Sequence, residues 1–203
     1  MRLALSIALL LATCGASAIA SAAKPAPKPE PAPPVPVTDA PNLKSLKKYS
    51  ENGVSMQLPG NWTVTNSIPN DGTGGVLSIE ADKEGLESIG LDVIVQIFPA
   101  DQTGSNEDLA KAVYERQVEG STNYSKPVIK PFTLGGGHPA IAQRYEHKIF
   151  TNDRPYAHRL DLIASKPCGK EWVCLIFSQT LQVNEQSASI GMGKIYETVK
   201  YAP

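Results

Sequence analysis

Residues 140–165 read AIAQRYEHKIFTNDRPYAHRLDLIAS, two long strand-like runs separated by Thr151-Asn152-Asp153-Arg154. Asn and Asp tolerate the backbone conformations of the tight two-residue turns that join antiparallel strands. We therefore expect a long β-hairpin with strands over 140–150 and 156–165. Such a hairpin predicts a largely antiparallel sheet, with neighbouring segments of the chain pairing on either side of it.

The register of this hairpin follows if its Asn-Asp dipeptide forms the turn. Two pairs of opposite charge then face each other, Arg144 with Asp161 and Glu146 with Arg159. Opposite charges across neighbouring strands stabilise a pairing, so they support this register. The other face would carry the pairs Tyr145–Leu160, His147–His158 and Ile149–Tyr156.

This register places His147 and His158 side by side. Two imidazoles across a strand pair can bind Zn²⁺ or Cu²⁺, but such a site needs a third or fourth ligand. None is evident beside them in the sequence, although Tyr145 and Tyr156 are close. We expect a half-buried cross-strand pair, and keep His147 and His158 as metal ligands in the alternative.

Segments on both sides of the hairpin complete an α+β pattern. A helix should begin at Ser105, where Ser105 and Asp108 form a capping-box-like start, and should end at Gly120. A last helix is expected from about Gln186 to Lys200. Further strands are expected at 54–58, 62–64, 76–81, 91–99, 128–134 and 172–181. This order predicts an α+β fold, a largely antiparallel β-sheet flanked by helices.

Residues 1–22 have the three parts of a secretory signal peptide. Arg2 gives a positive start, residues 3–12 are almost wholly apolar, and small residues continue as far as Ala22. The apolar run is too short to span a bilayer. We expect export to the periplasm or the cell exterior, with cleavage after Ala22 and cleavage after Ala20 as the second choice.

Cys14 lies within this segment, in Leu11-Ala12-Thr13-Cys14-Gly15. That sequence resembles a bacterial lipoprotein box, in which the cysteine becomes lipidated. The residue before the cysteine is normally Gly, Ala or Ser, and here it is Thr. We therefore expect Cys14 to be removed with the signal. Lipidation of Cys14, and with it a membrane-anchored lipoprotein, is the alternative.

Residues 23–42 differ sharply in composition from the rest of the chain. Proline recurs through them, which removes backbone donors and favours an extended polyproline II spacer. We expect a linker here, and a single domain over residues 43–203. That length suits one hydrophobic core.

Cys168 and Cys174 lie six positions apart around a Gly-containing turn, in KPCGKEWVC. In a protein that leaves the reducing cytosol, such a pair is expected to form a disulfide. Because the closed loop is short, the bond should contribute only about 2 kcal/mol to stability. A redox-active pair is disfavoured, since the spacing is not Cys-x-x-Cys.

The formal net charge of the whole chain is −1. The sequence contains no run of more than two consecutive Lys or Arg residues. Nucleic acid and anionic membrane surfaces are therefore not indicated as partners. No cofactor motif is present, and Gly72-Thr73-Gly74-Gly75 lacks the Lys-Ser/Thr of a phosphate loop. We expect no cofactor and a monomer with a protein or small-molecule partner.

The segment Gly135-Gly136-Gly137-His138-Pro139 can be compared with the oxyanion-hole loops of esterases. No G-x-S-x-G motif accompanies it, and the alternation of strand and helix typical of a hydrolase sheet is missing. We expect these glycines to allow a tight connection with positive φ between two strands.

Two further segments carry a resemblance to a known family. Residues 53–62 read GVSMQLPGNW, and residues 196–201 near the end of the chain read YETVKY. Together with the order of elements, they resemble the PsbP/Mog1/DcrB-like superfamily over roughly residues 49–202. The resemblance implies an antiparallel sheet between helices, an αβα sandwich. It also implies a binding or assembly role without shared catalytic residues.

The expected function is thus an exported, non-enzymatic binding or assembly module of the bacterial envelope. Trp62, Tyr145 and Tyr156 are the candidates for its contact surface. The alternative is a small periplasmic hydrolase or metal-dependent enzyme using His138, His147 and His158.

Overall fold

The computed structural model describes residues 37–70, 75–81, 90–148 and 157–203. Its strands form two antiparallel sheets. The strands are β1 (Lys47–Glu51), β2 (Val54–Leu58), β3 (Trp62–Ile68), β4 (Gly75–Ala81), β5 (Asp92–Pro99), β6 (Val128–Leu134), β7 (His138–His147), β8 (Ala157–Pro167), β9 (Trp172–Leu181) and β10 (Lys200–Tyr201). The two α-helices are α1 (Asn106–Val118) and α2 (Glu185–Thr198). A largely antiparallel β-sheet protein with helices is therefore confirmed.

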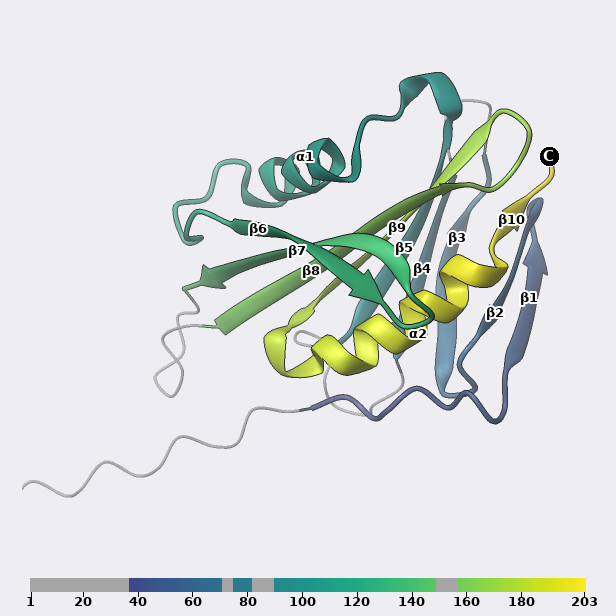
Figure 1. Ribbon diagram of the computed structural model, residues 1–203, viewed down its shortest axis with the longest axis horizontal. Helices are drawn as coiled ribbons and strands as arrows, with labels where there is room; N and C mark the ends of the chain where they lie inside the picture. Colours follow the sequence, from purple (N-terminus) through teal and green to yellow (C-terminus); the bar gives the residue numbers. More distant parts are fainter. Residues whose placement is uncertain (1–36, 71–74, 82–89, 149–156) are drawn as a thin grey trace, which may run out of the picture. The chain divides into compact units, whose positions relative to one another are not determined.

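The large sheet has the strand order β3-β4-β5-β9-β8-β7-β6, and β1, β2 and β10 form a separate small sheet in the order β1-β2-β10 (Figure 1). The chain leaves β5 inside the large sheet and returns at its edge as β6, so α1 crosses β9, β8 and β7. It leaves β9 through α2 and reaches the small sheet as β10. The sequence predicted neither β1 nor β10, nor a division into two sheets.

Each helix covers its own face of the large sheet. Successive side chains of a strand point to opposite faces, so the same strand contributes to both cores. On one face, Leu160, Leu162 and Ala164 of β8 join a core with Ala188, Met192 and Ile195 of α2. On the other, Ile141 and Ile163 pack with Ala110, Leu109 and Val113 of α1. Figure 1 shows α1 and α2 on different sides of β7 and β8.

Local signals set the helix ends as expected. The Ser105 hydroxyl accepts from the Asp108 backbone N–H, and the Asp108 carboxylate accepts from the Ser105 backbone N–H, which completes a capping box. Helix α1 ends at Val118, and Gly120 lies just beyond it with a φ of 72°. The glycine loop also behaves as predicted, since Gly136 and Gly137 have φ values of 84° and 85°.

The predicted register of the β7–β8 hairpin is wrong by one residue. Arg144 lies opposite Leu160 and Tyr145 opposite Arg159, while Gln143 pairs with Asp161 and Glu146 with His158. The proposed turn residues, and Ile149 and Tyr156 of the predicted pairs, lie outside the described residues.

The physical reason is that helices cover both faces of this hairpin. Charged side chains of the hairpin therefore pair with residues of other elements and not only with residues of the opposite strand. Arg144 donates to Glu185 of α2 at 2.7 Å, while Asp161 is buried on the α1 face. Opposite charges on adjacent strands were thus a misleading guide to register.

The chain before β1 makes specific contacts with the folded body. The Thr38 backbone N–H donates to Asn184 Oδ1 at 2.9 Å, and Thr38 is only 4% exposed. The Asn61 side chain donates to the Ala40 carbonyl oxygen at 3.1 Å. The last residues of the proline-rich stretch therefore already belong to the packed structure. No helix within the described ranges is long and apolar enough to cross a membrane.

Candidate functional site: a groove beside helix α1

Helix α1 crosses only part of its sheet face, and a groove of about 260 Å³ opens between α1 and strands β5 and β9. Apolar side chains form much of its lining, and amides and one guanidinium supply the polar groups. The lining residues are Gln96, Phe98, Leu109, Ala112, Val113, Arg116, Gln117, Leu175, Phe177 and Gln179. An apolar hollow with a few polar groups directed into it is typical of small-molecule sites.

The strand register explains how this lining arises. Gln96 lies opposite Leu175 across the β5–β9 pair, and the next residues on the same face are Ile94 opposite Phe177. Asp92 lies opposite Gln179 one step further on. Amide and aromatic groups from two strands far apart in sequence thereby share one floor, and α1 forms the wall.

A buried polar cluster lies beside the groove and shares Gln117 with it. The Tyr145 hydroxyl donates to Gln117 Oε1 at 2.9 Å and lies 3.3 Å from Asp161 Oδ1. Gln143 Nε2 donates to Asp161 Oδ2 at 3.4 Å. Both Gln143 and Asp161 are fully buried. Such a cluster is costly to bury unless its hydrogen bonds are made, so it holds its members in place.

Aromatic rings fix the position of Tyr145. The Tyr114 ring of α1 meets it edge-on at 5.4 Å between centroids, and the Tyr124 ring lies at 5.9 Å. Tyr124 in turn stacks on His147 at 4.2 Å. The Tyr145 hydroxyl is thus held between α1 and β8.

Burial dominates the electrostatics of this cluster. It raises the pKa of Asp161 to about 7, although the Arg159 guanidinium and the hydrogen bonds from Tyr145 and Gln143 act in the opposite direction. Burial and the adjacent Asp161 also raise the pKa of Tyr145. A carboxyl group that changes charge near neutral pH next to a groove is a candidate functional group.

Two neighbouring groups respond to the same surroundings. Lost hydration and the Glu80 carboxylate raise the pKa of Asp92, and Arg159 opposes this. Burial, with a smaller effect from Arg159, lowers the pKa of His147. The positive charge of Arg159 therefore lowers the pKa of all four of these groups, Asp161, Tyr145, Asp92 and His147.

A larger hollow of about 430 Å³ lies between β1 and β3 and is more open to solvent. Side chains already bridge it: Lys47 Nζ donates to the Trp62 carbonyl oxygen at 3.0 Å, and the Tyr49 hydroxyl donates to Ser67 Oγ at 3.1 Å. Several of its polar groups thus already have partners within the chain. The groove beside α1 is the better candidate for a ligand site.

The structure does not bring the three histidines together. His138 and His147 occupy the two ends of β7, roughly 30 Å apart at about 3.3 Å per residue. His147 lies opposite Ala157, and His158 lies opposite Glu146 with 3.7 Å between His158 Nδ1 and Glu146 Oε1. His147 and His158 therefore point to opposite faces, so the expected side-by-side pair is wrong. Within the described ranges, no cluster of three His, Cys, Asp or Glu side chains could bind a metal.

His138 has its own surroundings at the end of α2. Its ring stacks on Tyr196 at 4.6 Å, and its Nε2 lies 3.5 Å from Glu197 Oε1. The Gly135 backbone N–H, in the loop before it, donates to the Ser189 carbonyl oxygen of α2 at 3.1 Å. His138 and the glycine loop thus pack against a helix.

The predicted contact surface is wrong for two of its three residues. Trp62 is fully buried and Tyr145 is 3% exposed, so both are core side chains. Tyr156 lies outside the described residues, as does Cys14. The lining of the groove contains none of the residues that the sequence singled out.

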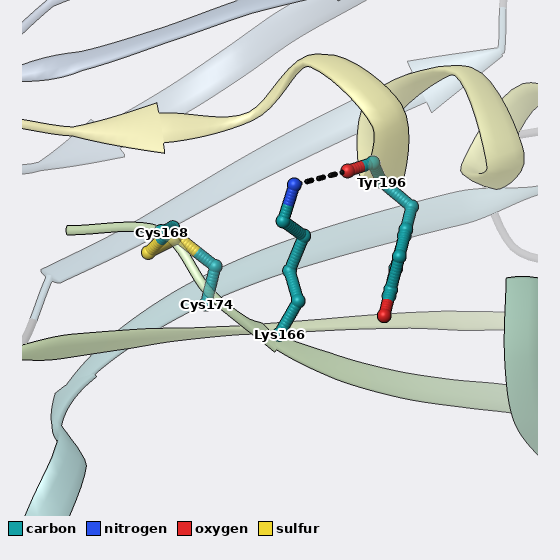
Figure 2. The surroundings of a disulfide bond; sticks show 4 residues. All are labelled: Lys166, Cys168, Cys174 and Tyr196. Carbon is teal, nitrogen blue, oxygen red and sulfur yellow. Dashed lines mark hydrogen bonds between the residues drawn. A yellow bond between two sulfur atoms is a disulfide. The ribbon is translucent and has the colours of Figure 1, made fainter.

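Cys168 and Cys174 form the expected disulfide at the end of the β8–β9 hairpin. Nearby, Lys166 Nζ donates to the Tyr196 carbonyl oxygen at 2.9 Å, within the last turn of α2 (Figure 2). A cation at this end of a helix satisfies a free carbonyl and complements the helix dipole. A disulfide of this kind fits an oxidising compartment.

The groove and its polar neighbours were not predicted from the sequence. One signal pointed to them: Asp161 lies between Leu160 and Leu162, and Gln143 directly follows the apolar run Ala140-Ile141-Ala142. Polar groups in such positions need buried partners or a function. No protein-family model matches the chain, and no curated protein matches it.

Proposed function

We propose that this protein is an exported, non-enzymatic binding module of the bacterial envelope, with the αβα sandwich of PsbP/Mog1-like proteins. Its ligand would be a small amphipathic molecule held in the groove beside α1. One observation carries the proposal: an apolar floor and wall meet amide side chains in a hollow of about 260 Å³. That volume lies just below the range of about 300–1,000 Å³ that is usual for drug-sized ligands, so the groove suits a small molecule.

The chemistry of the lining favours binding over catalysis. The described residues that line the groove comprise amides, apolar side chains and Arg116, with no Ser, Cys, His or carboxylate. Covalent catalysis needs a nucleophile beside a base, and acid–base catalysis needs a titratable group within reach of the substrate. Two carboxyl groups lie close to the lining: Asp161 lies behind Tyr145 and Gln117, and Asp92 lies opposite Gln179 across the β5–β9 pair.

Export has separate support. The signal-like first 22 residues and the Cys168–Cys174 disulfide agree with an oxidising compartment outside the cytosol. The proline-rich linker would separate the domain from its point of attachment if Cys14 were lipidated. We favour the form in which Cys14 is removed and the protein occupies the periplasm.

The groove can be tested by filling it. Ala112 is an exposed residue of α1 that lines the groove, so Ala112→Trp should occupy the space without disturbing the core. We expect the affinity for the neutral dye N-phenylnaphthylamine, measured by fluorescence titration, to fall about tenfold or more, a loss of about 1.4 kcal/mol.

Glu115→Trp is the matched control, because Glu115 is also exposed on α1 but does not line the groove. It should bind the dye as the unmodified protein does. Equal dye affinity in both variants would place the binding elsewhere and refute the proposed site.

A further inference from the structure

Gln117 connects the groove to the buried carboxyl of Asp161. Its side chain lines the groove, and its Oε1 accepts from the Tyr145 hydroxyl at 2.9 Å. The same hydroxyl lies 3.3 Å from Asp161 Oδ1. Any effect of this connection on a ligand rests on the proposed binding function of the groove.

The Tyr145 hydroxyl has one proton and two neighbouring acceptors, so it can donate to only one of them. If Asp161 is protonated, it can donate to Tyr145 Oη, and Tyr145 donates onward to Gln117 Oε1. The amide nitrogen of Gln117 is then free to donate to a molecule in the groove.

Ionisation of Asp161 reverses the direction of these bonds. A carboxylate attracts the Tyr145 proton more strongly than a neutral amide oxygen does. Gln117 Oε1 would then face the lone pairs of the Tyr145 oxygen, and the amide must turn its nitrogen toward Tyr145. Its oxygen, an acceptor, would point into the groove instead.

We propose that the groove binds a small apolar carboxylate, and that its affinity for this ligand follows protonation of Asp161 through Tyr145 and Gln117. The carboxylate accepts from the Gln117 amide while Asp161 is protonated. It meets an acceptor, and a second negative charge nearby, once Asp161 is ionised. Ligand binding and proton uptake at Asp161 are thereby coupled.

Charge complementarity favours a carboxylate over other ligands of the same size. Arg116 is the charged residue of the described lining, and no ion pair to it occurs among the described residues. The amides of Gln96 and Gln179 add further donors on the sheet floor. Guanidinium and amide N–H groups are the donors that carboxylates require. The apolar body of the ligand would lie on Phe98 and Phe177.

Other titratable and charged groups lie on the elements that surround Asp161. They are Arg159 on its own strand, Tyr145 and His147 on β7, Asp92 on β5, Glu80 on β4, Tyr114 and Arg116 on α1, and Tyr124 before β6. Arginine stays protonated, and burial raises the pKa of Tyr145 and Tyr114. Burial and Arg159 lower the pKa of His147, so this histidine loses its proton at a lower pH than an unperturbed one.

The test uses octanoate, octanol and octylamine as probes, measured by calorimetric titration of the purified protein near pH 6 and near pH 8. Octanoate is ionised at both values, so its own charge does not change. With a pKa of about 7, the protonated fraction of Asp161 falls roughly tenfold over this range, and the octanoate affinity should fall by about the same factor. Octanol should bind with little pH dependence, and octylamine more weakly than octanoate.

Two variants isolate the proton-dependent step. Asp161→Asn should remove the pH dependence of octanoate binding, and Gln117→Met, which keeps the length of the side chain, should weaken octanoate at about pH 6 while sparing octanol. His147→Gln is the control for a histidine that titrates in the same region, and it should keep the pH dependence. Circular dichroism of each variant verifies folding.

Octanoate binding that does not change between the two pH values, or that is weaker than octylamine binding, would overturn this inference. The proposed function would survive that result if N-phenylnaphthylamine still bound in the groove and Ala112→Trp still blocked it. If the dye did not bind, or if Ala112→Trp did not weaken its binding, the groove itself would be refuted as a ligand site. The two failures are therefore distinguishable.

Discussion

Asp161 occupies a position in β8 where the neighbouring side chains, Leu162 and Ile163, are apolar and fully buried. An isolated carboxylate in such a place is costly, and the protein responds with a pKa raised to about 7. Gln143 and Tyr145 make hydrogen bonds to it, and Gln143 Oε1 has no partner among the described residues. The site is thus better suited to a neutral Asp161 than to a charged one.

This predicts a stability that decreases with rising pH. The unfolded carboxyl titrates near about 3.9, so between that value and about 7 the folded state holds a proton that the unfolded state has lost. Over this window the free energy of unfolding should fall by up to about 1.4 kcal/mol per pH unit, and above it the effect of Asp161 is constant. Asp92 contributes in the same direction, because its pKa is also raised in the folded protein and its ionisation also lowers the free energy of unfolding.

Asp161→Asn should flatten this pH dependence. Asn keeps an acceptor for Tyr145 and cannot ionise, so the variant should be more stable than the unmodified protein at about pH 8, by one to a few kcal/mol, roughly. Urea unfolding at several pH values between about 4 and 8 measures it. Identical slopes for the two proteins would contradict the prediction. Asp108 does not interfere, since its lowered pKa acts only at lower pH.

Single residues were predictable where their partners are close in sequence. Ser105 and Asp108 are three positions apart, and their capping box formed as expected. Trp62, a predicted contact residue, is instead fully buried, because residues of α2 more than a hundred positions away pack on it. Nothing near Trp62 in the sequence carries that information.

Helix α2 approaches its neighbours closely through two glycines. A Cβ at Gly191 would collide with the Trp62 ring, and a Cβ at Gly193 would collide with the Gly135 carbonyl oxygen. Glycine inside a helix normally costs stability relative to alanine, about 1 kcal/mol. Here it allows α2 to lie against both β3 and the loop before β7.

Gly191→Ala should therefore destabilise the protein although it favours the helix. Trp62 is fully buried and cannot move aside, so overpacking of about 1–3 kcal/mol should outweigh the propensity gain. Gln186→Ala, at an exposed position of the same helix, is the matched control and should change stability by less than about 0.5 kcal/mol. Thermal and urea unfolding compare them, and an unchanged or more stable Gly191→Ala would contradict the close packing.

At the level of elements, the strands and helices were predictable but their register was not. Apolar periodicity located β7 and β8, while the one-residue offset depended on residues outside the hairpin. Arg144 pairs with Glu185 of α2, a contact that no pattern within β7 and β8 indicates. The register was predicted from residues of the two paired strands alone, whereas the observed register also depends on how helix α2 packs against them.

At the scale of the whole molecule, the groove exists because three distant segments meet. Strand β5, helix α1 and strand β9 contribute its lining, and they are brought together by a sheet order in which β5 and β9 are neighbours. Sequence patterns locate each element along the chain but not its place in the sheet. They therefore predict an α+β fold and not the place where that fold leaves one sheet face uncovered.

The disulfide links parts of the molecule that the sequence patterns treat as separate. Beyond closing the β8–β9 hairpin, Cys168 accepts through its carbonyl oxygen from the Tyr201 backbone N–H at 2.6 Å, so it also holds β10. Strand β10 pairs with β2 in the small sheet, and Tyr201 packs edge-on against Trp172 of β9 at 5.2 Å. The hairpin end is thus a junction between the large and the small sheet.

We predict that breaking the disulfide loosens this junction before it unfolds the molecule. Closure of so short a loop stabilises by about 2 kcal/mol, too little to abolish folding of a domain whose core spans both sheets. The double variant Cys168→Ala, Cys174→Ala should lose about that amount in urea unfolding and should show faster amide exchange first at Tyr201 and Ala202, because β10 is short and depends on the Cys168 carbonyl. Lys170→Ala, an exposed change inside the same loop, should leave both measurements unaltered. Exchange that rises uniformly across β5, β8 and β9 would instead show that the disulfide supports the large sheet as a whole.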